Sequence, residues 1–89
     1  MIGRELNLAV VGLGFVGLPA AIMLARAGKK VIGVDINDPL IRRLQARECP
    51  INEPSVASGF HDAATQPNFT ATKTVPVAET YILAVPTPL

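Results

Sequence analysis

The stretch from Val10 to Ala21 reads VVGLGFVGLPAA, and three glycines, at positions 12, 14 and 17, interrupt a run that is otherwise apolar. Glycine inside a regular element costs about 0.5–1 kcal/mol relative to alanine, so each of them needs a reason. The spacing Gly-x-Gly-x-x-Gly is typical of a chain that turns from a strand into a helix and brings bare backbone close to a ligand. The elements on either side of the loop decide whether this interpretation holds.

Strand and helix alternate in the first half of the chain. Residues 6–11 have the profile of a strand buried on both faces, and apolar residues then recur at helical spacing at positions 16, 20, 23, 24 and 27. Gly28 is a stop signal for this helix. Residues 30–35 form a second buried strand, which ends on Asp35.

An amphipathic helix is predicted over residues 38–48. Asp38 is expected to cap it, Pro39 suits its first turn, and Leu40, Ile41 and Leu44 are expected to face inward. Parallel strands joined in this way need crossover connections, which the two helices supply.

The second half is less regular. Residues 49–68 read as a loop around a short helix, 69–73 as a short strand, 75–79 as a brief helical turn and 80–85 as a third buried strand. The sequence therefore predicts an α/β fold, a partial Rossmann fold with a parallel sheet and helical crossovers. Such a sheet normally continues after its third strand, so residues 1–89 are expected to be the N-terminal part of a larger dinucleotide-binding domain, without the catalytic and substrate domains.

Each residue of the glycine loop has a role in a dinucleotide site. Gly12 permits the tight turn, Gly14 lets a pyrophosphate approach the backbone, and Gly17 lets the helix pack close to the strand. Asp35 follows Gly17 by eighteen residues, where an acid accepts hydrogen bonds from the adenosine ribose. Its charge favours NAD over NADP. Simple helix–sheet packing, an FAD-binding fold, which often has Glu at this position, and a methyltransferase, which usually has another glycine spacing, are the alternatives.

Composition argues against several other classes of protein. Eight basic and seven acidic residues give a net charge of +1 without a basic block, which disfavours nucleic-acid binding. The single cysteine forms no disulfide framework and no metal cluster, so the reducing cytoplasm is expected. Residues 8–25 carry no charge and 25–27 resemble a signal cleavage site, but the glycines and Pro19 make a poor apolar helix there, so no membrane segment is expected.

Four blocks together resemble one known family. VVGLGFVGLPAA (10–21), VIGVDIN (31–37), CPINEP (49–54) and LAVPTP (83–88) are similar, in this order, to the N-terminal segment of the UDP-glucose/GDP-mannose dehydrogenases. The blocks are most similar to those of the UDP-N-acetyl-D-mannosamine dehydrogenases within that family. The resemblance covers essentially the whole chain.

The resemblance implies a nucleotide-sugar 6-dehydrogenase that oxidises a C6 alcohol to a carboxylate and reduces two NAD per turnover. The substrate would be UDP-N-acetyl-D-mannosamine or UDP-glucose, the product a precursor of surface polysaccharide, and the full-length enzyme a homodimer. The family's catalytic cysteine, lysine and acids lie beyond position 89. A non-catalytic dinucleotide-binding module or a truncated remnant is the alternative. The cofactor-binding residues that the resemblance implies here are Gly12, Gly14, Phe15, Val16, Gly17, Asp35 and Thr87.

One position departs from the family pattern. Many members carry a lysine or arginine five residues after the ribose-binding acid, where this chain has Leu40, and Arg42 or Arg43 could replace it only if the helix presents one of them suitably. The pair is otherwise expected on the solvated face of the helix.

Three other sites contain residue types that are often catalytic, but no role in the chemistry is assigned to them. Cys49 lies outside the family's catalytic context and is expected to be a structural or incidental thiol. The pair His61 and Asp62 is expected in a solvated loop, and Glu53 matches a family loop without an assigned chemistry.

Overall fold

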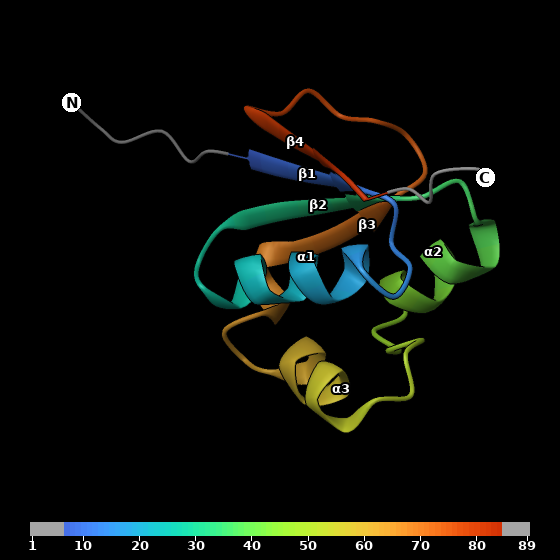
Figure 1. The fold of residues 1–89 in the computed structure, drawn as a ribbon, viewed down its shortest axis with the longest axis vertical. Helices are drawn as coiled ribbons and strands as arrows, with labels where there is room; N and C mark the ends of the chain where they lie inside the picture. The colour runs from blue at the N-terminus through green and yellow to red at the C-terminus, as the bar shows by residue number, and fades with distance from the viewer. Residues whose placement is uncertain (1–6, 85–89) are drawn as a thin grey trace.

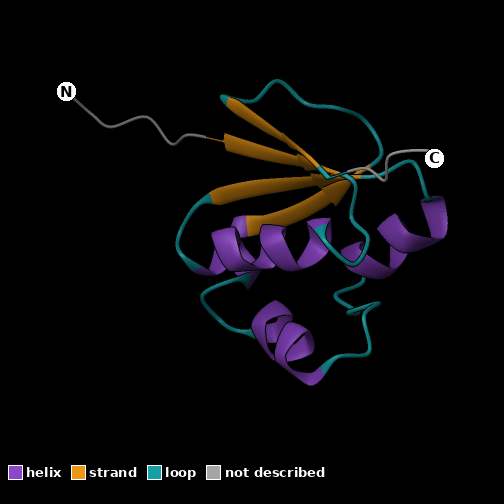
Figure 2. Cartoon of the chain, viewed as in Figure 1, coloured by secondary structure: helices purple, strands orange, loops and turns teal. Residues whose placement is uncertain are grey.

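The computed structural model describes residues 7–84, which contain four strands, three α-helices and one short 3-10 helix. They are, in chain order, β1 (Asn7–Val11), α1 (Gly17–Arg26), β2 (Lys30–Val34), α2 (Asp38–Gln45), α3 (Pro54–His61), η1 (Gln66–Asn68), β3 (Phe69–Thr72) and β4 (Thr80–Leu83). Figure 1 shows their arrangement and Figure 2 the same view by secondary structure.

The strands form one parallel sheet in the order β3-β2-β1-β4. Val10 of β1 lies opposite Gly33 of β2 and Ile82 of β4, and Phe69 of β3 lies opposite Val31 of β2. Because every pair is parallel, the carboxyl ends of the strands meet at one edge of the sheet. The predicted α/β class, with its parallel sheet and helical crossovers, is confirmed.

All three helices lie on the same side of the sheet, with α3 packed outside α1 (Figure 1). The core between these layers consists of buried apolar side chains from both. Its members include Val10, Leu13, Leu18, Ala21, Ile22, Ala25, Val31, Ile41, Leu44, Phe60 and Phe69. The last two rings meet edge to face, with centroids 6.1 Å apart.

Helix α1 buries a different stripe from the one that the apolar spacing emphasised. Leu18, Ala21, Ile22 and Ala25 are buried, whereas Met23 is 67% exposed. An almost entirely apolar helix carries little information about which side faces the sheet. The close approach of Gly17 to Gly12, in the loop after β1, fixes the rotation instead, as described below. Within residues 7–84 no helix combines the length and apolar character needed to cross a membrane.

Helix α2 begins and ends differently from the prediction. Its N-cap is Asn37, whose side-chain oxygen accepts a hydrogen bond from the N–H of Leu40 at 3.1 Å, so the prediction that Asp38 caps it is wrong. An N-cap must lie outside the helical backbone, and Asn37 is extended there (φ −74°, ψ 101°). The helix ends at Gln45, and Arg47 then adopts a φ of 63°. Ile41 and Leu44 are buried as expected.

The helical turn predicted over residues 75–79 is absent from the structure. The connection must run from the carboxyl end of β3 back to the amino end of β4, and it does so on the side away from the helices (Figure 2). A strand of four residues is about 13 Å long, whereas five helical residues rise only about 7.5 Å, so an extended connection is needed. Tyr81 anchors it, because its hydroxyl donates to the carbonyl of Pro76 at 2.6 Å and accepts from the N–H of Ala78 at 3.0 Å.

Strand β4 is not buried on both faces, in contrast to the prediction. Tyr81 is 45% exposed and Leu83 is 73% exposed, while Ile82 packs partly against the core. β4 lies at the edge of the described sheet, and no other described element covers its second face. Because successive side chains of a strand point to opposite faces, Tyr81 and Leu83 are exposed on one face while Ile82 packs against the core on the other.

Candidate functional site

The site is built at the carboxyl edge of the sheet, where β1 turns into α1. Gly12 follows β1 with a φ of 100°, a left-handed conformation that favours glycine, and its N–H donates to the carbonyl of Val34 at 2.8 Å. This bond holds the start of the loop against β2. The chain then exposes residues 14–16 before the helix begins at Gly17.

Gly17 is required by packing. A Cβ placed on it would lie 1.7 Å from the carbonyl oxygen of Gly12 and 3.2 Å from the Cβ of Ala84. The first of these contacts is impossible without moving backbone. The third glycine of the motif therefore lets α1 approach both the loop and Ala84, the residue that follows β4, and it sets the rotation of the helix.

Gly14 is not required by packing or by backbone conformation. A Cβ placed on it meets no atom within 4 Å, the residue is exposed, and its φ lies outside the left-handed region. Alanine would therefore fit the described chain at this position. The absent side chain leaves open space directly above the loop.

Asp35 directly follows β2 and faces the loop. Its Oδ2 accepts from the N–H of Leu13 at 2.9 Å, and its Oδ1 accepts from the N–H of Asn37 at 2.9 Å. Its own N–H donates to the carbonyl of Thr72 at 3.2 Å, so β3 also holds it. The carboxylate is half-buried and fixed by two backbone donors. One lone pair on each oxygen remains free to accept further hydrogen bonds.

An open cavity of about 700 Å³ lies above the loop. Its lining residues are Gly12, Gly14, Phe15, Val16, Asp35, Ile36, Asn37, Leu40 and Ala84. Phe15 is 86% exposed and Ile36 is 91% exposed, so apolar side chains project at its mouth. The cavity thus brings five of the seven predicted site residues together. Gly17 is not among the lining residues, and Thr87 lies outside the residues that the structure describes.

Four residues of this lining escaped the sequence analysis as site residues, namely Ile36, Asn37, Leu40 and Ala84. The available signal was position, because residues just after a parallel strand lie at the ligand-binding edge of the sheet. Leu40, five residues after Asp35, lines the cavity with an apolar side chain. Arg42 instead pairs with Asp38, with 2.6 Å between Nε and Oδ2, and Arg43 pairs with Glu48 at 3.7 Å.

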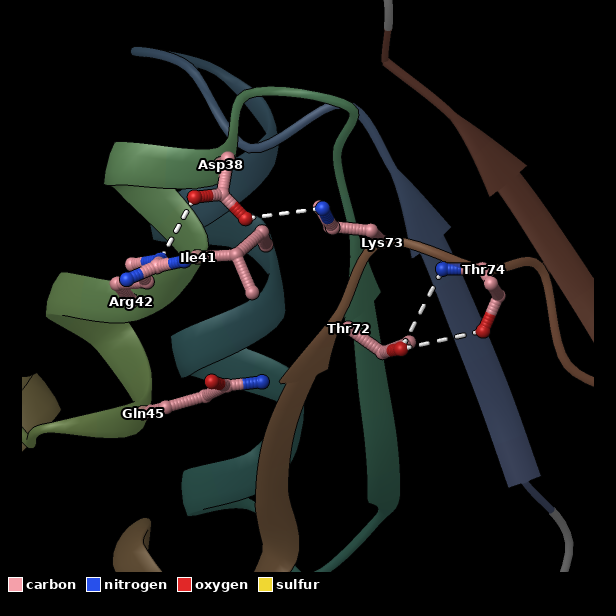
Figure 3. Close-up of a pocket in the computed structure, with 7 residues that line it drawn as sticks. All are labelled: Asp38, Ile41, Arg42, Gln45, Thr72, Lys73 and Thr74. Atoms are coloured by element: carbon pink, nitrogen blue, oxygen red, sulfur yellow. Dashed lines mark hydrogen bonds and ion pairs between the residues drawn. The ribbon is translucent and has the colours of Figure 1, made fainter.

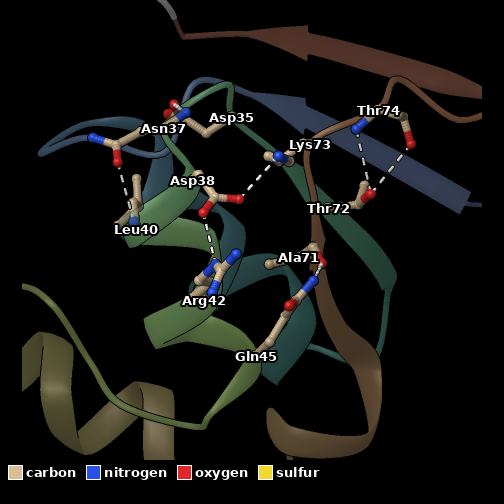
Figure 4. A network of polar contacts seen from close by, with 10 residues as sticks. All are labelled: Asp35, Asn37, Asp38, Leu40, Arg42, Gln45, Ala71, Thr72, Lys73 and Thr74. Carbon is tan, nitrogen blue, oxygen red and sulfur yellow. Dashed lines mark hydrogen bonds and ion pairs between the residues drawn. The ribbon is translucent and has the colours of Figure 1, made fainter.

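A second, polar cavity of about 500 Å³ lies between α2 and the end of β3 (Figure 3). It is lined by Asp38, Ile41, Arg42, Gln45, Thr72, Lys73 and Thr74. Asp38 stands between two cations there, since Lys73 Nζ lies 2.9 Å from its Oδ1 (Figure 4). The Lys73 hydrogen bond, with the charge of Arg42, holds the pKa of Asp38 below its ordinary value. The carboxylate is therefore ionised at neutral pH.

The remaining candidates take structural positions. The Cys49 thiol is half-buried and donates to the carbonyl of Ile51 at 3.5 Å. Asp62 pairs with Arg26 at 3.2 Å, and exposed His61 packs edge-on against the ring of Phe60. Among the described residues no cluster of side chains suits a metal ion.

Glu53 caps α3. Its carboxylate accepts from the N–H groups of Ser55 and Val56 and from the Ser55 hydroxyl. These hydrogen bonds lower the pKa of Glu53, and the bonds from Ser55 have the largest effect. Its presence in the CPINEP block therefore has a helix-capping explanation.

Comparison with known proteins agrees with the geometry. The model of the UDP-glucose/GDP-mannose dehydrogenase family, NAD binding domain, matches residues 6–89. A UDP-N-acetyl-D-mannosamine dehydrogenase of Methanococcus aeolicus is 41% identical over 86 residues, and that of Escherichia coli K12 is 42% identical over 83 residues. These matches cover 96% and 92% of this chain but 20% of each relative.

The solved structures show the same relationship. The UDP-N-acetyl-mannosamine dehydrogenase Cap5O from Staphylococcus aureus superposes with a TM-score of 0.85 at 39% identity. The superposition covers 92% of this chain and 20% of Cap5O. The chain therefore spans about one fifth of the length of the relatives that it matches.

Proposed function

Because the chain belongs to the UDP-glucose/GDP-mannose dehydrogenase family and matches its NAD-binding domain, we propose that the cavity above the glycine loop holds NAD. The open space at Gly14 carries this proposal. Since neither packing nor backbone conformation requires a glycine there, a ligand that approaches the backbone explains it best. A pyrophosphate is such a ligand.

The start of α1 suits the charge of that group. The N-cap residue, Val16, forms no side-chain hydrogen bond to the first turn of the helix. In the first turn of α1 the N–H groups of Leu18 and Ala20 donate to the carbonyls of Gly14 and Val16, and Pro19 has no N–H, so the helix dipole is the main feature here that favours an anion. The glycine backbone and the helix end thus converge on the same open space, which is where the pyrophosphate is placed.

The adenosine ribose is placed on Asp35. Its carboxylate already accepts two backbone hydrogen bonds, and an ionised carboxylate has about four acceptor positions, so two remain for the ribose hydroxyls. The side chains of Phe15, Val16 and Ile36 offer apolar contact around the bound molecule. Thr87, beyond the described residues, is proposed as a further contact at the same edge of the sheet.

At the level of the whole protein we propose a nucleotide-sugar dehydrogenase. Oxidation of a C6 alcohol to a carboxylate removes four electrons, and NAD, when bound, accepts a hydride, so two molecules are reduced for each sugar. The relatives named UDP-N-acetyl-D-mannosamine dehydrogenases favour that nucleotide sugar over UDP-glucose as substrate. A homodimer in the cytoplasm that supplies precursors of surface polysaccharide completes the proposal.

The experiment measures binding and turnover separately in the full-length protein. NAD is titrated by calorimetry, and UDP-N-acetyl-D-mannosamine and UDP-glucose are each supplied with NAD while NADH is followed. Two NADH per carboxylate formed from the first sugar is the expected result. NAD binding with no oxidation of either sugar would support a non-catalytic binding module, and absence of NAD binding would refute the proposed site.

A further inference from the structure

Asp38 lies three residues after Asp35, the proposed ribose acceptor, and forms ion pairs with two basic side chains. Its Oδ1 lies 2.9 Å from Nζ of Lys73, and its Oδ2 lies 2.6 Å from Nε of Arg42 (Figure 4). The two partners come from different elements, because Arg42 is on α2 and Lys73 follows β3. Asp38 is also the first residue of α2, so its negative charge faces the positive end of the helix dipole.

Lys73 connects this cluster to the dinucleotide site. Besides the polar cavity, it lines a smaller cavity of about 190 Å³ together with Gly12, Asp35 and the apolar residues Val11, Val34, Ile36 and Val75. Lys73 and the ribose acceptor Asp35 therefore border the same space. A phosphate on the 2′ position of the ribose would add a charge of about −1.5 to −2 close to both of them.

A cation beside the ribose-binding acid is the usual means of accommodating a 2′-phosphate. This chain has such a cation in Lys73, with Arg42 and the N-terminus of α2 nearby, but the Asp38 carboxylate pairs with both side chains and offsets part of this positive charge. Asp35 repels a 2′-phosphate directly. Asp38 adds to that repulsion and also occupies the groups that would attract the phosphate.

We propose that Asp38 is a specificity-determining residue, which favours NAD over its 2′-phosphorylated form by pairing with Lys73 and Arg42 beside Asp35. This inference rests on the proposed NAD site and goes beyond it, because Asp38 lies outside the predicted cofactor-binding set. A purely structural role for Asp38 at the start of α2 would alter stability and would leave the ratio of the two affinities unchanged.

The test is a comparison of NADP and NAD dissociation constants in the full-length protein. Asp38→Asn keeps the size of the side chain and removes its charge, so the ratio of the NADP to the NAD constant should fall at least about threefold at low salt. At about 0.5 M salt the effect should shrink, since exposed charges are then screened. Glu48→Gln, which removes the carboxylate that pairs with Arg43, is the charge-matched control and should leave the ratio unchanged.

Two further variants identify the cation. Lys73→Gln alone should raise the ratio of the NADP to the NAD dissociation constant. In the Asp38→Asn background it should reverse most of the fall in this ratio that Asp38→Asn causes. A ratio that does not respond to Asp38→Asn, or a fall that persists without Lys73, would overturn the inference while leaving the NAD site intact. Failure of the parent protein to bind either dinucleotide would refute both. Lys73→Gln also supplies the test should Asp38→Asn fail to fold, because an unchanged ratio in that variant is equally decisive.

Discussion

The backbone N–H of Leu13 donates to Oδ2 of Asp35 at 2.9 Å and joins the turn after β1 to the end of β2. Leu13 can do this because its side chain points the other way, into the core, where it is 1% exposed. An alanine at Gly33 would collide with it, with 2.8 Å between the new Cβ and Leu13 Cδ1. The buried side chain thus orients the N–H that fixes the carboxylate.

Asp35→Ala is therefore expected to have two effects. Loss of the ribose acceptor should weaken NAD binding by about 1–3 kcal/mol, the range for a charged hydrogen-bond partner. Loss of the bond to Leu13 should also lower the melting temperature without ligand. Calorimetric NAD titration and thermal unfolding measure these two effects. The difference between the affinities for NAD and NADP should also become smaller.

Asp35→Asn separates these effects, because the amide keeps one acceptor oxygen for the loop. It should recover part of the lost melting temperature while discrimination against NADP stays reduced. An alanine variant that binds NAD as the parent does would show that Asp35 is not the ribose acceptor.

Acid should weaken the cap of α3 through Glu53. Its folded-state pKa is lowered from 4.5 by the bonds from Ser55 and Val56, so the ionised form stabilises the helix. That contribution is complete above the unfolded pKa and is lost as the pH falls through the lower folded value. The melting temperatures of the parent and Glu53→Gln should therefore differ near neutral pH, begin to converge as the pH falls below 4.5, and become equal only below the lower folded pKa.

A series of thermal unfolding curves between about pH 7 and pH 3 checks this expectation. Glu48→Gln is the matched variant, since it removes one exposed carboxylate without touching α3. A constant difference between parent and Glu53→Gln across the series would show that the cap does not depend on the carboxylate charge.

Local signals account for most of what the sequence predicted. The order of strand, glycine loop, helix, strand and acid depends on residues close together in the chain, and it led directly to the cavity that Gly12, Gly14 and Asp35 line. Gly28, which was predicted to stop the first helix, follows the end of α1 with a φ of 98°. These features follow from backbone conformation, which neighbouring residues largely determine.

The features that escaped prediction depend on contacts between distant segments. The buried side of α1 is set by Gly17 against Gly12 and Ala84, and no periodicity within an apolar helix reports that contact. Lys73 reaches Asp38 only because β3 lies beside β2 in the sheet. The extended path of residues 75–79 likewise follows from the distance between two strand ends.

Residues 1–89 are expected to fold weakly by themselves. A chain of this size buries only about 60–65% of its unfolded surface, and β4 leaves Tyr81 and Leu83 exposed at the edge of the sheet. These residues alone should unfold over a broad range of temperature and give poorly dispersed amide signals. A sharp thermal transition with dispersed amide resonances would contradict this expectation.

Gly14→Ala and Gly17→Ala should separate ligand binding from folding. At Gly14 a Cβ meets no atom within 4 Å, so the unliganded melting temperature should hardly change. The same methyl group would occupy the space given to the pyrophosphate, and the NAD dissociation constant should rise at least tenfold, about 1.4 kcal/mol. At Gly17 the Cβ would lie 1.7 Å from the Gly12 carbonyl oxygen, so the helix must shift and stability should fall by about 1–3 kcal/mol or more.

The two variants are measured side by side in the full-length protein, by calorimetry and by NAD titration. The expected pattern is opposite, with affinity lost at position 14 and stability lost at position 17. The comparison is informative because the two glycines lie three residues apart in one motif, and their surroundings differ. If Gly14→Ala binds NAD normally and only melts earlier, the glycines serve packing alone, and the pyrophosphate does not lie above this loop.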